Sequence, residues 1–447
     1  MDMSEWLPPE TRSYLAKVRE EIDRSSPPQI ASRIKGLYGR HDRWREKSCI
    51  NLIASENIMS PTVKLLFGSD LGYRVCDGPV GKKLLPAGGG AKYLEEIEAY
   101  VIEIARRLFN AEYAEHRTQS GTQACQAVQY ALTNPGDTIM SQALSDGGNA
   151  ANRDMGPPRF YQLKIVDLPY NGKEMNVDLS KFEEEATKTK PKLIILGAMI
   201  MLFPHPLKEI IQVAKAIDSK VVYDGAHVGA LIAGGRFEDP LREGCDALIV
   251  NTHKIMGGPT GAMILVNDGE IARKVSEATF LGLVQTPYCN RLAALAMSLT
   301  EMLAFRHQYA EQIIKNAKTL AKTLDKGGLN VIGREKGYTE SHQVLLDVKD
   351  FGGGYEAEKT LTEANIVSNK ISLPWDSRAE EHGGSAFVTG LRLGTPEVTR
   401  RGMKEKEMVQ IGNFICRILV DKEDPNAVRK EVSNFMKKYQ KARYCFD

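Results

Sequence analysis

The middle of the chain alternates short apolar runs with segments of helical spacing. Strands are predicted over 192–201, 220–223, 247–250 and 261–266, with a helix over 207–218 between the first two. The run at 192–201 is apolar without alternation, which is typical of a strand covered on both faces. Strand–helix–strand alternation therefore predicts an α/β fold with a mostly parallel sheet and helices on both faces.

Charged, helix-prone sequence precedes this region, with helices predicted over 11–23 and 30–47. These helices offer too little apolar surface for a core of their own, so residues 1–50 are predicted to form an arm. An amphipathic helix follows, with apolar residues at spacings of three and four: Leu94, Ile97, Val101, Ile104 and Leu108.

The pattern changes near residue 300. A long helix is predicted over 303–324, followed by strands at 344–348 and 390–393 and a helical end, which is the pattern of a smaller α+β lobe. For a length of 447 residues we therefore expect three parts. They are the arm at 1–50, a large domain at 51–300 and a small C-terminal domain at 301–447.

Composition and charge exclude several classes of protein. Hydrophobic residues make up 42% and charged residues 26%, which is enough apolar material for a folded core and excludes global disorder. The 59 basic and 57 acidic side chains leave a net charge of +2, so we expect neither a nucleic-acid nor a membrane partner. A basic cluster at 437–443 is interpreted as a solvated helix face.

Cysteine usage and the apolar runs indicate a cytoplasmic protein. The seven cysteines are scattered and never form a C-x-x-C pair, which argues against a disulfide framework or a structural zinc site. The first residues carry no recognisable signal peptide. The longest apolar run, 193–203, is too short to cross a bilayer. No metal is expected.

Three polar motifs stand directly after strands or before a helix, where open α/β sheets bind ligands. They are Asp-Gly-Ala-His at 224–227, Thr-His-Lys at 252–254 and Ser-Gly-Thr at 120–122. Singly, each has a structural alternative, such as a strand cap, a core histidine or a helix N-cap. Together they meet the needs of pyridoxal 5′-phosphate (PLP). These are a lysine able to lose its proton, an aspartate for the ring nitrogen and a helix N-terminus for the phosphate.

Further motifs resemble the serine (glycine) hydroxymethyltransferase family, from about residue 45 to residue 440. They are Asn-Leu-Ile-Ala-Ser-Glu-Asn at 51–57, Ser-Gly-Thr-Gln-Ala at 120–124, Asn-Pro-Gly-Asp at 134–137, Thr-His-Lys at 252–254, Asn-Lys at 369–370 and Gly-Leu-Arg-Leu-Gly-Thr-Pro at 390–396. Ser-His-Gln-Val at 341–344 is similar to the archaeal branch. The resemblance implies PLP fold type I, as in aspartate aminotransferase, and a homodimer with active sites at the subunit interface.

The resemblance also implies a role for each site residue. Lys254 would bind PLP covalently, Asp224 would face the ring nitrogen and His227 would contact the phenolic oxygen. The other residues expected to bind PLP are Ser120, Gly121 and Thr122 at the phosphate, together with Asn149 and Thr252. Segment 280–282 of the neighbouring subunit would also reach the phosphate.

On the substrate side, Arg392 and Ser55 would hold the amino-acid carboxylate. Asp77 and His253 are the acid/base candidates beside Lys254.

The chain departs from the family around this site. Where the family has a tyrosine and an acid/base glutamate, this chain has Val75 and Asp77. Leu84 and Leu85 stand in place of a pair of tyrosines. Asn149 replaces the histidine that stacks on the cofactor ring, Met199 replaces a serine and Gly257 replaces an arginine. The loss of a ring and of hydroxyl groups predicts a wider, more apolar pocket.

We therefore expect aldol-type cleavage or formation of the Cα–Cβ bond of a small α-amino acid similar to glycine, serine or threonine. One version uses a folate-type or methanopterin-type pterin as one-carbon carrier, since Asn369 and Asp376 stand in the family's pterin-side loop. The alternative is a pterin-independent aldolase or transaldolase with a different aldehyde, or another Cα reaction such as racemisation. A catalytically dead scaffold is disfavoured because Lys254, Asp224 and Arg392 are all retained.

Overall fold

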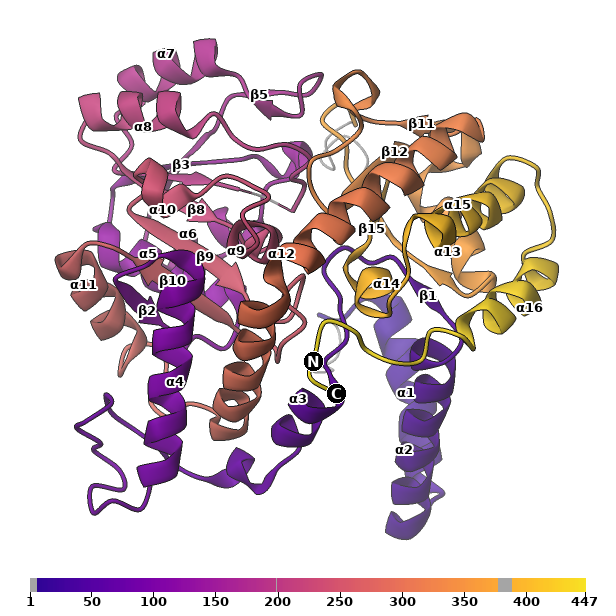
Figure 1. Ribbon diagram of the computed structural model, residues 1–447, viewed down its shortest axis with the longest axis horizontal. Helices are drawn as coiled ribbons and strands as arrows, with labels where there is room; N and C mark the ends of the chain where they lie inside the picture. Colours follow the sequence, from indigo (N-terminus) through magenta and orange to yellow (C-terminus); the bar gives the residue numbers. More distant parts are fainter. Residues whose placement is uncertain (1–5, 198, 377–387) are drawn as a thin grey trace.

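Two main sheets, each covered by its own helices, organise the chain into a larger and a smaller lobe (Figure 1). The computed structural model describes residues 6–197, 199–376 and 388–447. Among these residues, no helix combines the length and the apolar character that crossing a membrane requires.

The larger lobe contains a seven-stranded sheet. In sheet order the strands are β2 (Tyr113–Glu115), β10 (Ala262–Val266), β9 (Ala247–Asn251), β8 (Lys220–Asp224), β7 (Leu193–Leu196), β3 (Thr138–Ser141) and β4 (Lys164–Asp167). Neighbours from β9 to β4 run parallel, and β10 is antiparallel to both of its neighbours. The predicted α/β fold with a mostly parallel sheet is confirmed.

Both faces of this sheet are buried, which explains the unbroken apolar runs. In β7, Leu193 and Ile195 belong to one hydrophobic cluster, whereas Ile194 and Leu196 belong to the cluster on the other face. One face is covered by α5 (Gly121–Leu132) and α11 (Gly269–Thr279). The other is covered by α4 (Lys92–Phe109), α7 (Leu179–Thr189), α8 (Leu207–Ala216), α9 (Gly229–Ala233), α10 (Pro240–Glu243) and the first half of α12 (Cys289–Lys326).

Helix α12 joins the two lobes. It has 38 residues and begins 14 residues before the predicted start at 303, so it runs through position 300 without a break. Leu295 and Leu299 pack in the core of the larger lobe, and Ala317 and Leu320 pack in the core of the smaller lobe. The same rigid helix therefore contributes to both cores.

The smaller lobe is built on a four-stranded antiparallel sheet. Its strands, in sheet order, are β11 (Asn330–Val331), β12 (Gln343–Asp347), β15 (Gly390–Gly394) and β14 (Asn369–Ile371). Its helices are α13 (Gly353–Glu363), α14 (Pro396–Arg400), α15 (Glu405–Leu419) and α16 (Pro425–Met436). The N-terminal chain also joins this lobe, because β1 (Ile50–Asn51) pairs in parallel with β13 (Ile366–Val367).

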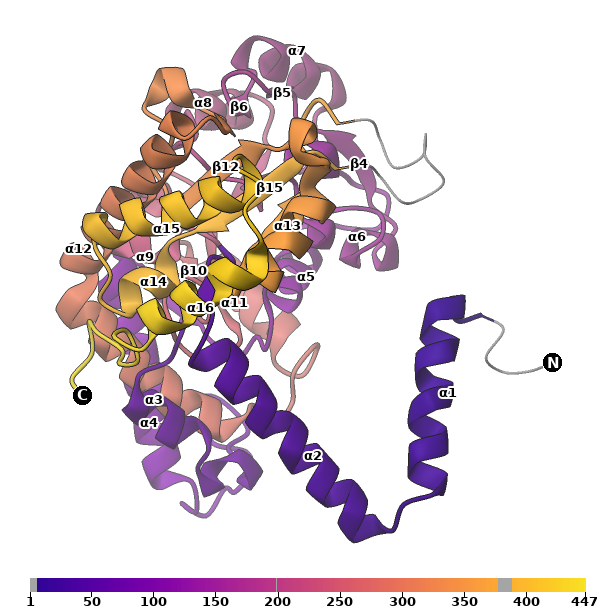
Figure 2. The same ribbon diagram turned by 90° about the vertical axis from the view of Figure 1, so that its right-hand side faces the viewer.

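The arm consists of two helices, α1 (Pro9–Asp23) and α2 (Pro27–His41), and a π-helical turn at Asp42–Glu46. Neither α1 nor α2 has a buried residue, and both project from the two lobes (Figure 2). Their apolar side chains are exposed; they include Leu15, Ile22, Ile34 and Leu37.

Short elements complete the chain. They are α3 (Pro61–Phe67), α6 (Pro157–Phe160), the paired strands β5 (Tyr170–Asn171) and β6 (Asn176–Val177), and 3₁₀ turns at Asp70–Tyr73, Leu144–Asp146, Ala150–Asn152, Arg334–Lys336 and Lys349–Phe351.

Candidate active site

Neighbouring strands of the larger sheet end beside one cavity. Asp224 is the last residue of β8, and Lys254 lies three residues beyond β9. The cavity has a volume of about 270 Å³. Its lining residues are Ser55, Asn149, Met199, Asp224, Ala226, His227, His253, Lys254 and Arg392. Seven of the twelve predicted site residues therefore lie together.

The smaller lobe supplies Arg392 and the N-terminal chain supplies Ser55. Arg392 is the central residue of β15. Beside it, a Cβ on Gly394 would lie 2.3 Å from Ala54 Cα, so only glycine lets the 54–55 segment pack this closely against the strand. Gly394 N also donates to Leu52 O at 2.7 Å. This contact places Ser55 beside the cavity.

The carboxylate of Asp224 is buried and held by two donors. Its Oδ2 accepts a hydrogen bond from Asn149 Nδ2 at 3.0 Å, and its Oδ1 accepts one from Ala226 N at 3.2 Å. Asn149, which stands where the resemblance places a ring-stacking histidine, therefore orients the aspartate in this structure.

Lys254 has an amine that gives up its proton easily. Burial lowers the pKa of Lys254 to about 8, although the carboxylate of Asp224 acts in the opposite direction. A neutral amine is the form that attacks a carbonyl carbon, so this environment suits a Schiff-base lysine.

Arg392 is a buried cation without a carboxylate partner among the described residues. Its Nη1 donates to Met199 O at 2.5 Å, and its Nε and Nη2 lie 3.3 Å from Asn369 Oδ1. Both acceptors are neutral. Burial lowers the pKa of Arg392 to about 10, so the guanidinium stays charged near neutral pH and fits a substrate carboxylate.

The two histidines of the cavity are neutral. Burial, with help from the charges of Lys254 and Arg392, holds the pKa of His227 well below its usual range. Burial also lowers the pKa of His253 to about 4, and its Nδ1 lies 3.5 Å from Gly261 N. His253 therefore has one ring nitrogen near a backbone donor.

The predicted phosphate site lies at the N-terminus of α5, beside the cavity lining rather than in it. The Ser120 hydroxyl caps the helix and accepts from Gln123 N at 3.1 Å. No acceptor among the described residues meets the N–H groups of Gly121 and Thr122. Two free N–H groups at the positive end of a helix are suited to a phosphate. Thr252, in contrast, is fully buried and donates its hydroxyl to Pro259 O.

These features fit PLP. Lys254 would bind the aldehyde carbon, Asp224 would pair with the ring nitrogen and the α5 N-terminus would bind the phosphate. The fit rests on the chemistry of the side chains: an easily deprotonated amine opposite an oriented carboxylate, with unoccupied N–H donors nearby.

Asp77 does not line the cavity of its own chain. It is buried, its Oδ2 accepts from Thr286 Oγ1 at 3.3 Å, and its Oδ1 has no partner. The surrounding loop exposes Val75, Leu84 and Leu85, which are 38%, 53% and 55% exposed. The expected phosphate-binding segment 280–282 also lies at the surface, with Leu281 at 63% exposure.

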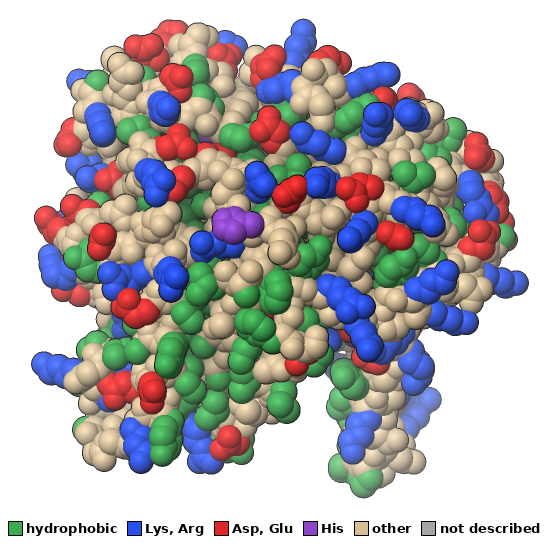
Figure 3. Space-filling model, viewed as in Figure 1, with side chains coloured by type: hydrophobic (Ala, Val, Ile, Leu, Met, Phe, Trp, Pro, Cys, Tyr) green, Lys and Arg blue, Asp and Glu red, His purple; other side chains and the backbone are tan. Residues whose placement is uncertain are grey.

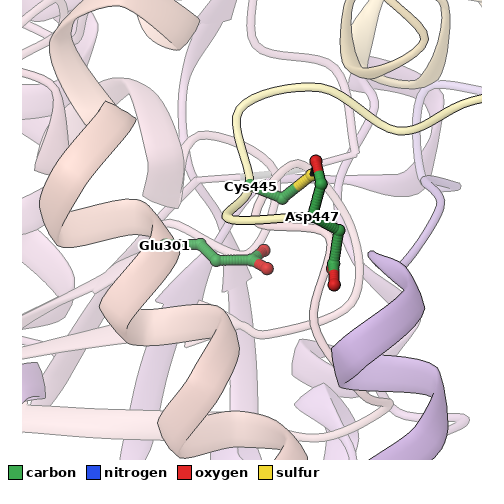
Figure 4. A group of neighbouring side chains, drawn as sticks. All are labelled: Glu301, Cys445 and Asp447. Carbon is green, nitrogen blue, oxygen red and sulfur yellow. Dashed lines mark hydrogen bonds between the residues drawn. The ribbon is translucent and has the colours of Figure 1, made fainter.

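One group of potential metal ligands lies elsewhere among the described residues. Atoms of Glu301, Cys445 and Asp447 lie within 4.8 Å of one another (Figure 4). Protein partners already hold two of the three, because Arg400 binds Glu301 and Thr62 binds Asp447. This group joins the C-terminal segment to α12.

Sequence reasoning missed the contacts that support the cavity. Gln343 contacts both His227 and Met199, the His342 ring stacks on the His227 ring, and Asn369 holds Arg392. All three residues stand in motifs of the sequence, but the motifs do not indicate these contacts. The available signal was a pair of polar residues at the start of an otherwise apolar strand.

Comparisons with known proteins agree with this geometry. The family model of serine hydroxymethyltransferase matches residues 29–415. The chain belongs to that family. Serine hydroxymethyltransferases from Pyrococcus furiosus and Korarchaeum cryptofilum are 42% and 39% identical to it, each over 94% of this chain and 97% and 98% of the relative. The structure is also similar to that of L-threonine transaldolase from Pseudomonas fluorescens in its internal aldimine state. The TM-score is 0.84 at 29% identity, covering 97% of this chain and 96% of the other.

Membership of this family establishes the general chemistry. The protein is a PLP-dependent enzyme that acts on the Cα–Cβ bond of a small α-amino acid by aldol-type chemistry. The predicted cofactor, fold and reaction type are confirmed.

Proposed function

We propose that the cavity around Lys254 cleaves and forms the Cα–Cβ bond of a β-hydroxy α-amino acid such as serine or threonine. The supporting observation is that one cavity contains Lys254 with its lowered pKa, the oriented carboxylate of Asp224 and the unpaired guanidinium of Arg392. PLP supplies, when bound, the electron sink for the charge that develops at Cα.

Each residue of the chain has a defined task in this proposal. Arg392 binds the substrate carboxylate with Ser55 beside it, which fixes the bonds around Cα. The Asp224 carboxylate favours a proton on the ring nitrogen, and His227 contributes a neutral side chain at the cavity wall. Asp77 or His253 exchanges a proton with the β-hydroxyl oxygen as the bond breaks.

We propose that the enzyme is a homodimer and that each active site uses residues of both subunits. Asp77 and segment 280–282 lie outside the cavity of their own chain, and the loop around Asp77 exposes apolar side chains. Hydrophobic side chains also gather over α3, α4 and the first half of α12 (Figure 3); they include Leu65, Tyr93 and Tyr100. A second copy would cover this surface together with the arm.

Two versions of this reaction compete, one in which a pterin carries the transferred carbon and one that uses no pterin. The overall similarity to serine hydroxymethyltransferases favours a pterin. The apolar residues Val75, Leu84 and Leu85, where the family has tyrosines, favour a pterin-independent aldolase or transaldolase, as does the similarity to L-threonine transaldolase. We favour an enzyme in which pterin-free cleavage of β-hydroxy amino acids rivals pterin-dependent turnover of serine.

Turnover of serine and threonine should be measured with and without a reduced pterin, with the aldehyde product trapped. The loss of two hydroxyl groups costs about 1–3 kcal/mol each where a partner stays buried, so pterin-dependent transfer should be weak. The double substitution Val75→Tyr and Asp77→Glu should raise it. A wild-type rate that already rises by orders of magnitude on adding pterin would assign the enzyme to one-carbon transfer instead.

We also propose a cytoplasmic location and, apart from the second subunit, small-molecule partners without nucleic acid or membrane. The thiol state of all seven cysteines and the balanced net charge support this assignment.

A further inference from the structure

Gln343 links the smaller lobe to the cavity through its side-chain amide. It is the first residue of β12 and is fully buried. Its Oε1 accepts a hydrogen bond from Met201 N at 2.9 Å, and its Nε2 donates to Met199 O at 3.0 Å. The same Nε2 lies 3.3 Å from His227 Nδ1. One amide therefore contacts the segment after β7 and a histidine of the cavity.

The two backbone contacts fix the orientation of this amide. An N–H group such as Met201 N can only be met by the amide oxygen, and a carbonyl such as Met199 O can only be met by the amide nitrogen. The Nε2 group has two hydrogens, and its two neighbours are Met199 O and His227 Nδ1. Nδ1 must therefore accept, which leaves the ring proton of a neutral His227 on Nε2.

The surroundings of His227 keep it neutral. Burial and the positive charges of Lys254 and Arg392 oppose a positive charge on it. The His342 ring lies nearly parallel to it, with 5.8 Å between centroids and an interplanar angle of 11°. Among the described residues, none forms a hydrogen bond with His227 Nε2. This atom is also not fully enclosed by protein, so its N–H is available to a ligand in the cavity.

We propose that Gln343 is a positioning residue that holds His227 in the Nε2–H tautomer, so that His227 donates a hydrogen bond to an oxygen of the bound cofactor. This inference rests on the proposed assignment of the cavity as the PLP site. Met199 O also accepts from Arg392 Nη1 at 2.5 Å. Gln343 and Arg392 therefore share one acceptor, which couples the orientation of His227 to the group that binds the substrate carboxylate.

The substitution Gln343→Glu tests the tautomer, because it preserves the shape of the side chain and reverses its hydrogen bonding. A carboxylate oxygen would accept a hydrogen bond where the amide nitrogen donates one. His227 would therefore have to carry its proton on Nδ1, and the Nε2 that faces the cavity would be unprotonated. Gln343→Met removes the donor without introducing an acceptor. Gln440→Glu, at a half-buried glutamine far from the cavity in sequence that bonds Lys47 O and Met436 O, is the matched control for an added carboxylate.

The primary measurement is nuclear magnetic resonance of protein with ¹⁵N-labelled histidine, with and without PLP. His227 is assigned by the loss of its signals in His227→Asn. We expect Nε2 protonated in the wild type and in Gln440→Glu, Nδ1 protonated in Gln343→Glu and no single tautomer in Gln343→Met. We also expect kcat/KM for amino-acid cleavage to fall about tenfold or more in Gln343→Glu.

A wild-type proton on Nδ1, an unchanged tautomer in Gln343→Glu, or a reversed tautomer with unchanged kcat/KM would each overturn the inference. The tautomer is measured without cofactor as well, so it is independent of the PLP assignment. That assignment is tested separately by trapping PLP on the protein with borohydride, a reaction that Lys254→Ala should abolish.

Discussion

Burial controls the chemistry of single residues in the cavity. The same loss of solvent lowers the pKa of Lys254 to about 8 and that of His253 to about 4, while Arg392 remains a cation. The result is an imidazole that is neutral at neutral pH and an amine that loses its proton as the pH rises through about 8, next to a fixed positive charge. A neutral amine is needed to bind PLP, and a fixed cation is needed to bind a carboxylate.

The lowered pKa of Lys254 predicts how cofactor binding depends on pH. Only the neutral amine reacts with the aldehyde, so the rate at which cofactor-free protein takes up PLP should rise with pH and level off above about 8. In stopped-flow absorbance measurements, a rise that continues toward the ordinary lysine pKa would contradict the assigned environment. Without cofactor, the folded state binds fewer protons here than the unfolded state between the two pKa values. This group should therefore make the protein more stable as pH rises through that window.

Substitution of Arg392 should separate substrate binding from cofactor binding. Arg392→Lys keeps the positive charge but loses the forked donor, and a hydrogen bond to a charged group contributes about 1.5–3 kcal/mol. We expect KM for serine or threonine to rise about tenfold to a hundredfold, with PLP absorbance unchanged. Arg236→Lys, at an exposed ion pair with Glu311, is the control. An unchanged KM would place the carboxylate elsewhere.

At the scale of elements, periodicity predicted the centre of each element better than its ends. The strands at β8, β9 and β10 and helix α4 lie where the apolar pattern indicates. Among the described residues of the run at 192–201, the strand covers Leu193–Leu196, and Ile200, Leu202 and Phe203 beyond it are buried in a loop against the smaller lobe. An apolar run reports burial and cannot by itself distinguish a strand from a buried loop.

Helix α12 shows the limit of the same reasoning. The sequence pattern does not predict its early start because its first half is packed between the larger core and α3 and α4, so residues on several sides of the helix are buried. Contacts made far along the chain decide such a helix, and a window of sequence does not contain them. The predicted domain limit at 300 falls inside this helix and stays a prediction.

The buried ion pair between α12 and α14 gives a stability prediction. Arg400 and Glu301 are both 1% exposed, and they contact each other (Figure 4 shows Glu301). Arg400→Met would leave a buried carboxylate without its partner, which should lower the free energy of unfolding by about 3–5 kcal/mol. The midpoint of urea unfolding measures this loss. The additional change Glu301→Gln should restore much of it, whereas Arg236→Met at a surface pair should cost less than about 1 kcal/mol.

At the scale of the whole molecule, the sequence predicted which residues belong to the active site better than it predicted which lobe or subunit supplies each of them. Lys254, Asp224 and His227 lie in one cavity because strand ends of an α/β sheet converge, which is a property of the fold class. Arg392 reaches the same cavity from β15 of the smaller lobe. Asp77 carries no such signal, because a single sequence does not say which subunit a loop serves. The contacts of Gln343 with His227 and Met199 could not be predicted either, since they depend on how the two lobes pack.

A shared active site predicts complementation between two inactive variants. Lys254→Ala removes the cofactor bond. If Asp77 is the acid/base group, Asp77→Asn removes it, and each variant should then be inactive alone in cleavage of β-hydroxy amino acids. If Asp77 serves the partner's cavity, a mixed dimer has one site with both defects and one site with neither. Random exchange of subunits should therefore restore about a quarter of the wild-type activity.

The same experiment excludes the arrangement within one chain. If Asp77 acted in the cavity of its own subunit, every site in a mixed dimer would lack one of the two groups, and activity would stay at the background of the separate variants. The mixture of Lys254→Ala with Arg392→Ala is the control. Both of these residues lie in one cavity of one chain, so this pair should not complement. Recovery with Asp77→Asn but not with Arg392→Ala would therefore assign the Asp77 loop to the neighbouring active site and would explain why this loop exposes its apolar side chains in a single chain.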